Sequence, residues 1–220
     1  MIMRGSGVKK GVLISIEGIE GCGKSTLISG LKNDLMCEGR QIIYTREPGG
    51  CKISEEIRKI VSSRENDDIA YLTELLMIYA ARNEHIDKVI NPSLEKGHVV
   101  ITDRYYDSSY AYQVGGQKIN PSILEALDSW VVKEAIPNLT ILLKVPIETC
   151  LERVNQRGKV DRFDEQGVDF FMNVQAEFNS RAKEDPSRVV VIEGTQTEQA
   201  VLEQVKAQIE NKVKACCMNG

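Results

Sequence analysis

The sequence predicts an α/β fold, a three-layer α/β/α sandwich in which a five-stranded parallel sheet lies between two layers of helices. Two observations indicate this fold. Five short apolar runs occur along the chain, and each is followed by a stretch with helical spacing. The runs are apolar almost throughout instead of alternating with polar residues, which is typical of parallel strands covered on both faces.

The strands and helices can be placed from the same pattern. The expected strands are Val12–Ile16, Gln41–Thr45, His98–Thr102, Leu139–Val145 and Arg188–Ile192. The expected helices are Lys24–Cys37, Ile53–Ser62, Ala70–Asn91, Pro121–Ile136, Ile147–Gln156, Val168–Glu184 and Glu198–Val213. Prolines border several of these helices, where the missing N–H does least harm. Because ligands of such sheets gather at the carboxyl ends of the strands, we expect the functional residues there.

The chain is expected to fold as one domain, because it has no internal repeat, no low-complexity tract and no linker. Residues 11–213 form this domain in our interpretation, with residues 1–10 as a flexible lead-in and residues 214–220 as a polar tail. A chain of 220 residues is long enough to bury a substantial core.

Composition excludes several classes of protein. The hydrophobic fraction of 42% and the charged fraction of 27% are ordinary for a globular protein and exclude disorder as the main state. The net charge of −4 argues against a dedicated nucleic-acid binder. No apolar run approaches the ~18 residues that a membrane span needs. The six cysteines form no C-x-x-C pair and have no zinc spacing, so we expect free thiols and a cytoplasmic location.

The segment from Gly18 to Ser25 carries the most informative motif. It reads G-I-E-G-C-G-K-S and fits G-x-x-x-x-G-K-[ST], the phosphate-binding loop of nucleoside triphosphate enzymes, between an expected strand and an expected helix. Its glycines let backbone N–H groups face an anion, Lys24 adds a point charge, and the Ser25 hydroxyl can ligate Mg²⁺. The candidate nucleotide-binding residues are Gly18, Glu20, Gly21, Cys22, Gly23, Lys24, Ser25 and Thr26.

A second candidate site follows the expected strand His98–Thr102. Asp103 stands at the end of this strand, where an acid orients Mg²⁺ directly or through water in enzymes of this class. Arg104 follows it, whereas an ATP-driven motor more often has a second acid there, and the sequence has no guanine-reading N-K-x-D motif. This pattern favours phosphoryl transfer to an organic acceptor, and the alternative is an ordinary Asp–Arg ion pair at the surface.

Three further motifs follow the same order as in a known family. T-R-E-P-G-G begins at Thr45, Y-A-A-R ends at Arg82, and D-R-Y-x-D-S-S-x-A-Y-Q runs from Asp103 to Gln113. Together with the phosphate loop, they make the chain resemble the bacterial thymidylate kinases from about Gly11 to the end of the last expected helix. The resemblance implies ATP-dependent phosphorylation of dTMP to dTDP for dTTP synthesis, with Mg²⁺ bound by Ser25 and Asp103. It also implies a homodimer, which the sequence itself does not show.

The resemblance assigns a role to each candidate residue. Lys24 and the loop amides would hold the phosphates of ATP, while Arg58 and Arg104 would grip the 5′-phosphate of dTMP. Around the rest of dTMP, Glu20 would reach the 3′-hydroxyl, Tyr112 would lie against the deoxyribose, Arg82, Ser109 and Gln113 would address the thymine edge, and Glu47 would position the metal or the arginines. The implied catalytic residues are Lys24, Asp103, Arg104, Arg157 and Arg162.

Two positions depart from the family pattern. Some members carry an arginine in the phosphate loop next to the acid, where this chain has Gly21, so the catalytic cation must come from elsewhere. The basic segment 153–164 occupies the place of the family's lid, and Arg157 and Arg162 are the candidates for closing over ATP. The alternative is an ordinary charged loop, which is the favoured interpretation for Lys159. Where the family usually stacks a phenylalanine on thymine, this chain has Ile78, which predicts weaker acceptor binding or looser base choice.

Two other functions remain open at this stage. One is a kinase for a different nucleoside monophosphate or deoxynucleoside, although two phosphate-gripping arginines favour a phosphorylated acceptor. The other is a nucleotide-dependent regulatory switch, which would hydrolyse ATP slowly and need no acceptor.

Overall fold

The structure is a computed structural model that describes residues 11–37, 39–157, 163 and 166–218. The expected lead-in, residues 1–10, lies outside the described residues, as do residues 158–162 and 164 of the expected lid segment. Of Arg157 only the backbone is described, at the end of a helix.

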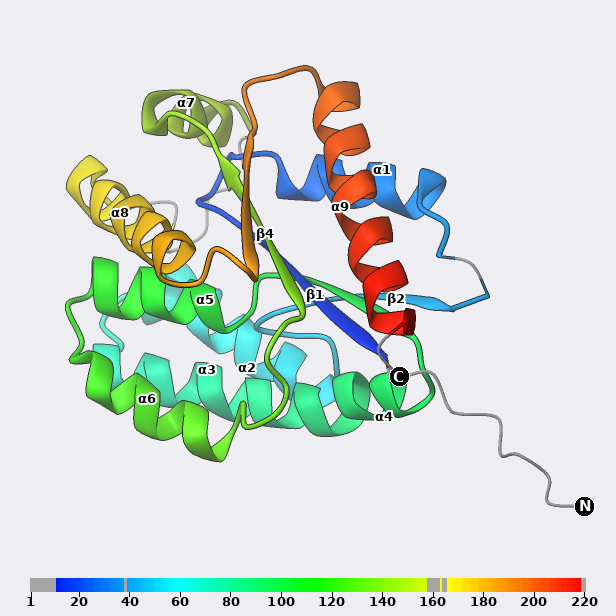
Figure 1. Cartoon of the computed structure of the whole chain (residues 1–220). Coiled ribbons are helices and arrows are strands. Elements are labelled where there is room, and N and C mark those ends of the chain that lie inside the picture. The colour runs from blue at the N-terminus through cyan, green and yellow to red at the C-terminus, as the bar shows by residue number, and fades with distance from the viewer. Residues whose placement is uncertain (1–10, 38, 158–162, 164–165, 219–220) are drawn as a thin grey trace, which may run out of the picture.

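The described residues contain one five-stranded sheet (Figure 1). Its strands are β1 (Val12–Glu17), β2 (Ile42–Arg46), β3 (Val99–Asp103), β4 (Leu139–Lys144) and β5 (Val189–Glu193), in the spatial order β2-β3-β1-β4-β5. All four pairings are parallel. The predicted five-stranded parallel sheet is therefore confirmed. At most strand ends, the observed limit differs from the expected one by one residue.

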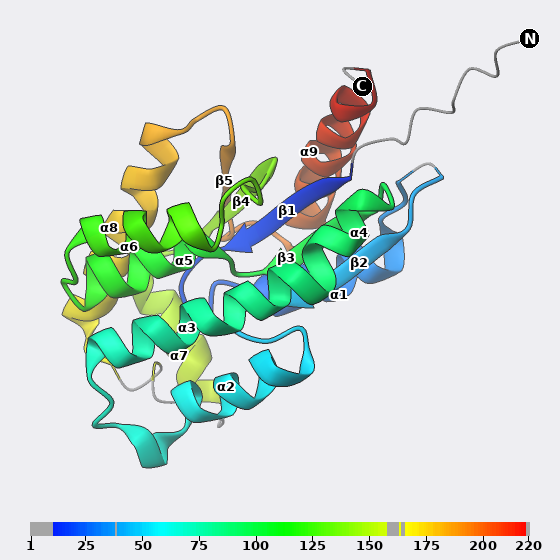
Figure 2. The ribbon, with the colours of Figure 1, turned by 90° about the horizontal axis from the view of Figure 1, so that it is seen from below.

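Helices cover both faces of the sheet, and Figure 1 and Figure 2 show them on either side of the strands. They are α1 (Lys24–Asp34), α2 (Lys52–Ser62), α3 (Tyr71–His85), α4 (Asn91–Glu95), α5 (Tyr106–Ser109), α6 (Pro121–Trp130), α7 (Ile147–Arg157), α8 (Val168–Glu184) and α9 (Glu198–Met218). A 3₁₀ turn, η1 (Arg64–Asn66), and two π-helical segments, η2 (Ile86–Ile90) and η3 (Tyr110–Gly116), complete the order. None of these helices has the length and apolar character that crossing a membrane requires.

The alternation of side chains along β1 divides the core in two. Ile14 belongs to the cluster that includes Leu31 of α1 and Ile209 of α9, whereas its neighbour Leu13 belongs to the cluster that includes Leu75 of α3. Successive side chains of a strand point to opposite faces, so each face of β1 is buried under its own helical layer. All six residues of β1 are buried, which explains why the strand is mostly apolar, with Ser15 and Glu17 as its polar residues.

The structure corrects several expected helix limits. The helix expected over 70–91 is three consecutive segments, α3, η2 and α4, and the helix expected to reach Ile136 ends at Trp130. The last helix continues to Met218 instead of ending at Val213, so the described part of the expected tail is helical. The turns of η3 were missed, because a π-helix changes the angular spacing of side chains and hides the 3.6-residue period.

Candidate active site

A cavity of about 730 Å³ opens at the carboxyl ends of the strands, where the fold places ligand sites. It extends from the loop after β1, over the ends of β2 and β3, to the inner faces of α3 and η3. The cavity brings together the predicted residues Glu20, Gly21, Cys22, Gly23, Lys24, Ser25, Thr26, Glu47, Arg58, Ile78, Arg82, Asp103, Arg104, Ser109, Tyr112 and Gln113. Gly18 is not among the residues that line it, and Arg162 and the side chain of Arg157 lie outside the described residues.

The phosphate loop closes on itself through Lys24. Its Nζ donates to the carbonyl oxygens of Gly18 at 2.9 Å and Ile19 at 3.0 Å, which holds the ammonium group inside the loop. Gly23 has a φ of 101° and precedes the first residue of α1. No side chain caps this helix start, so its free N–H groups can receive an anion.

Gly21 has no room for a side chain. Its φ is 74°, and a Cβ there would lie 2.2 Å from the carbonyl oxygen of Cys150 in α7. A loop arginine of the kind that some family members carry would therefore require α7 to move. The cation that contacts Gly21 itself is Arg153 of α7, whose Nη1 donates to the Gly21 carbonyl at 3.3 Å.

Arg104 connects the loop after β3 with the phosphate loop. It adopts a left-handed φ of 66°, which is uncommon for a residue with a side chain. Its guanidinium donates to the Gly18 carbonyl at 2.8 Å, to Glu20 at 2.7 Å and to the Tyr112 hydroxyl at 3.0 Å. Tyr112 in turn donates to Glu20 at 2.5 Å. Although burial alone would raise the pKa of Glu20, the charges of Arg104 and Lys24 hold it below the ordinary value.

A buried ion pair fixes Arg82 at the far end of the cavity. Arg82 donates from Nε to Glu47 at 2.7 Å and from Nη2 to Ser109 at 2.9 Å. His85 contacts the second oxygen of Glu47 at 2.8 Å. The remaining nitrogen of Arg82, Nη1, is buried and has no hydrogen-bond partner within the described chain. Glu47 therefore positions an arginine whose side chain lines the cavity.

The remaining predicted residues also face the cavity. Arg58 donates from Nη1 to the Pro48 carbonyl at 2.8 Å, so its guanidinium lies beside the turn after β2. Ile78 is 8% exposed, and its side chain contributes to the wall between Arg82 and the loop. Gln113 is almost fully buried and donates to Glu74 at 3.0 Å.

Ser25 and Asp103 carry side chains whose chemistry fits Mg²⁺. Both line the cavity, and a hydroxyl and a carboxylate supply the hard oxygen ligands that this ion prefers. The described residues contain no cluster of three or more His, Cys, Asp or Glu side chains that would form an all-protein metal cage. Mg²⁺ in nucleotide enzymes commonly takes one or two protein ligands and completes its shell with phosphates and water, so two ligands are sufficient.

Several residues of the site were missed from the sequence. Arg153 and Phe163 line the cavity, and Phe163 packs edge-on against Tyr112 with the ring centroids 6.1 Å apart. His85 and Glu74 are fully buried polar residues outside the cavity lining. His85 contacts Glu47, and Glu74 accepts a hydrogen bond from Gln113. A charged residue on an expected helix usually lies on the solvated face, so no pattern in the sequence singled out Glu74.

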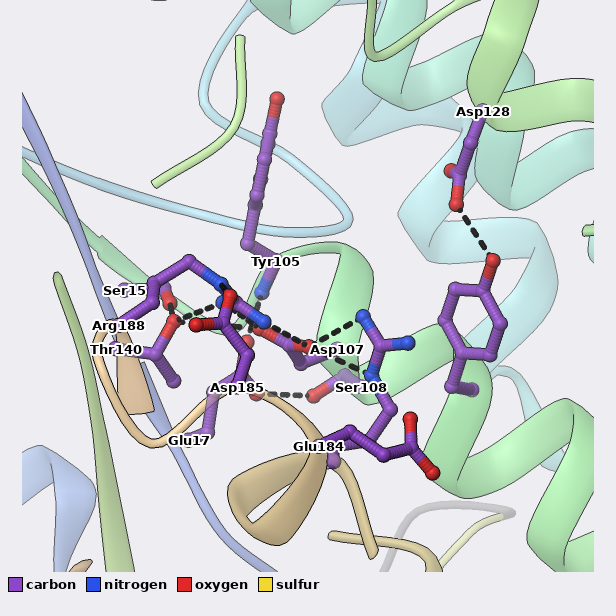
Figure 3. A network of polar contacts seen from close by, with 12 residues as sticks. Ser15, Glu17, Tyr105, Asp107, Ser108, Asp128, Thr140, Glu184, Asp185 and Arg188 are labelled. Carbon is purple, nitrogen blue, oxygen red and sulfur yellow. Dashed lines mark hydrogen bonds and ion pairs between the residues drawn. The ribbon is translucent and has the colours of Figure 1, made fainter. Parts of the chain in front are cut away.

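A buried polar network supports the floor of the site (Figure 3). Asp107 of α5 accepts hydrogen bonds from Arg188 at 2.6 Å and from Arg181 of α8 at 2.9 Å. Thr140 of β4 joins the network through Asp107 and through Ser15 of β1. The charges of Asp107, Arg181 and Arg188 are paired with one another, which offsets the free-energy cost of removing them from water.

Glu17 differs from Asp107 in this network, because its carboxyl group forms no ion pair within the described part of the chain. It accepts hydrogen bonds from the Tyr105 backbone N–H at 2.8 Å and from the Ser108 hydroxyl at 2.6 Å. Burial, and then the nearby charge of Asp107, raise the pKa of Glu17 to about 8. Glu17 therefore carries a proton at neutral pH.

The raised pKa predicts how stability depends on pH. The folded protein holds a proton at Glu17 that the unfolded chain releases above the ordinary carboxyl value of 4.5, so this contribution to stability is complete below that value and is lost as the pH rises toward about 8. For one proton the slope reaches about 1.4 kcal/mol per pH unit. Glu17→Gln, which cannot titrate, should therefore gain stability relative to the native protein between pH 5 and pH 8.

Urea unfolding at pH 5, 6.5 and 8 measures this difference. Glu56→Gln is the matched control, because Glu56 is exposed and its ion pair with Lys59 lies on the surface. The free energy of unfolding of this control should change with pH in parallel with that of the native protein. A Glu17→Gln curve that also runs parallel would contradict the assignment of the proton.

Comparison with known proteins places the chain in a family. The sequence profile described as "Thymidylate kinase" matches residues 16–205. The thymidylate kinase of Ruthia magnifica subsp. Calyptogena magnifica is 40% identical over 199 residues, which cover 90% of this chain and 97% of the relative. That of Hahella chejuensis is 36% identical over 208 residues, covering 94% and 98%. The crystal structure of thymidylate kinase from Ehrlichia chaffeensis superposes with a TM-score of 0.70 at 29% identity, covering 91% of this chain and 99% of that one. The chain belongs to the thymidylate kinase family.

Proposed function

We propose that this chain transfers the γ-phosphoryl group of ATP to dTMP and forms dTDP. One observation carries the proposal beyond family membership. One cavity is lined both by a phosphate-binding loop and by Arg82, a buried arginine paired with Glu47, and Arg58 and Arg104 line the same cavity. Such a cavity suits two nucleotides whose phosphates meet in the middle.

Catalysis rests on positioning and charge neutralisation, because phosphoryl transfer leaves little covalent chemistry for side chains. Lys24 and the N–H groups at the start of α1 hold the donor phosphates, while Arg58 and Arg104 orient the acceptor phosphate. The acceptor is already an anion at neutral pH, so no general base is needed. Mg²⁺, held by Ser25, Asp103 and phosphate oxygens, supplies neutralisation of the phosphate charge.

Glu20 and Tyr112 complete the acceptor site in this proposal. Glu20 stands beside the acceptor sugar, and Tyr112 packs under it. Both side chains are held in place by Arg104, so the same residue that grips the acceptor phosphate also orients the groups around the sugar. The edge of thymine then meets Arg82, Ser109 and Gln113.

The proposal is tested by coupling ADP formation to a spectrophotometric assay with ATP, Mg²⁺ and a panel of nucleoside monophosphates. ADP formation that depends on dTMP, with dTMP as the best acceptor, is the expected result. A different preferred acceptor would favour another monophosphate kinase. Slow ATP hydrolysis without any acceptor dependence would favour a regulatory switch and would end the main hypothesis.

We further propose that the lid segment supplies the catalytic cation, because Gly21 leaves no space for a cation in the loop. Arg157→Ala or Arg162→Ala should lower kcat by ~10³-fold while the KM for dTMP changes little, since an arginine of this kind acts on the transferred group. Steady-state kinetics of both variants check this, with Lys159→Ala from the same segment as the control. Near-normal turnover in both arginine variants would exclude the lid role.

The aliphatic side chain of Ile78 should weaken acceptor binding. It lines the cavity one helical turn before Arg82, where an aromatic ring would stack on the base. Stacking on a base is worth about 1–3 kcal/mol. Ile78→Phe should therefore lower the KM for dTMP at least several-fold in the coupled assay. An unchanged or higher KM would show that the pocket does not place the base against this residue.

A homodimer is proposed from the exposed apolar side chains of neighbouring helices α2 and α3. Ile53 and Ile60 of α2 and Leu72 and Leu76 of α3 are each about half exposed, whereas Leu75 and Tyr79 of the same helix are core residues. Sedimentation should give twice the mass of one chain, and Leu76→Glu should give a monomer. A native protein that sediments as a monomer would exclude the dimer.

All six cysteines are free in the structure, and several of them are buried. Together with the family membership, this supports the proposal of a cytoplasmic enzyme without disulfides.

A further inference from the structure

Glu74 is a fully buried carboxyl group that the proposed reaction does not use. It lies in the first turn of α3. Two glutamine side chains, one within η3 and one directly after η3, point toward its carboxyl group. Gln113 donates from Nε2 to Glu74 Oε1 at 3.0 Å, and Gln117 donates from Nε2 to the same oxygen at 2.7 Å. Only Gln113 of this pair lines the cavity.

A carboxylate at this position determines which way the Gln113 amide faces. The two ends of a glutamine amide have nearly the same shape, but one donates hydrogen bonds and the other accepts them. Glu74 Oε1 accepts from the NH₂ end of Gln113, so the carbonyl oxygen of that amide is turned away from Glu74. A second donor, Gln117, on the same oxygen confirms that Glu74 Oε1 acts as an acceptor.

The free end of Gln113 then acts together with Arg82. Ser109, one turn before Gln113, accepts a hydrogen bond from Arg82, so the two side chains meet on the same wall of the cavity. The guanidinium of Arg82 supplies N–H donors to this wall, and because the NH₂ end of Gln113 is bound by Glu74, the other end of its amide is an acceptor. A donor beside an acceptor matches a base edge in which a carbonyl lies next to a ring N–H. It conflicts with the edge of cytosine, in which an amino group lies next to an unprotonated ring nitrogen.

We propose that Glu74 is a positioning residue for base selection: it fixes the Gln113 amide so that the site accepts a pyrimidine with an N3–H and rejects cytosine. The proposal rests on the proposed dTMP kinase function. Without Glu74, the amide can rotate by half a turn and offer its NH₂ group to cytosine. The rotation needs no new space, so the loss of selectivity does not require a change in the shape of the cavity.

The test is the selectivity of Glu74→Gln, which keeps the shape of the side chain but can donate as well as accept. Calorimetric titration gives the Kd of dTMP and of dCMP on the same preparation, so a partly unfolded fraction cancels in their ratio. We expect the ratio Kd(dCMP)/Kd(dTMP) to fall about tenfold or more relative to the native protein, because a mismatched buried hydrogen bond is removed for cytosine and introduced for thymine. The kcat at saturating dTMP should change less than the KM.

Gln117→Leu is the matched control, since it removes the second donor to Glu74 and leaves Gln113 in place. Its Kd ratio should stay within about threefold of the native value. An unchanged ratio in Glu74→Gln, or an equal fall in Gln117→Leu, would overturn the proposal. If Glu74→Gln does not fold, Glu74→Met combined with Gln117→Leu removes the carboxylate together with one of its donors, and the same outcomes apply.

The native protein separates this inference from the proposed function. If the native protein neither prefers dTMP over dCMP nor phosphorylates dTMP, both the proposed function and the role of Glu74 fail. If native protein prefers dTMP and Glu74→Gln keeps that preference, only the role of Glu74 fails.

Discussion

The guanidinium of Arg104 holds the two halves of the site together. It stands at the end of β3, yet it contacts the first carbonyl of the phosphate loop, the acid within that loop and a tyrosine of η3. A left-handed backbone at Arg104 makes this reach possible, and the buried Glu17 receives the next N–H of the chain. The donor loop and the acceptor wall are thereby linked through one side chain, so their relative position is set before either nucleotide binds.

Two clusters of buried charge, one around Asp107 and one around Arg82, differ in how fully their polar groups are paired. Asp107 is surrounded by Arg181 and Arg188 and has its charge balanced within the protein. Arg82 is balanced by Glu47 but keeps one N–H without a described partner. An unsatisfied buried donor destabilises the empty protein and is satisfied when a ligand brings an acceptor. The first cluster is therefore structural, and the second is prepared for binding.

Much of this architecture could be predicted from the sequence, and the reasons for success and failure are physical. The strands β1 and β3 and the loop after β1 were found because buried parallel strands are apolar throughout and glycines mark where the backbone must turn. The segment η3 was missed because π-helical turns have no distinctive period. Glu74 and His85 were missed because their partners are far away in the sequence and a lone charged residue on a helix normally faces water. The lid arginines were identified from sequence alone and remain predictions.

The contact between Gly21 and α7 constrains how this protein can change over generations. An arginine in the loop and the present packing of Cys150 against the loop are mutually exclusive, because the two would occupy the same space. A lineage that acquired an arginine at position 21 would have to shift α7 as well. The identity of one loop residue is therefore coupled to the placement of a helix far away in the sequence, so the two can change only together.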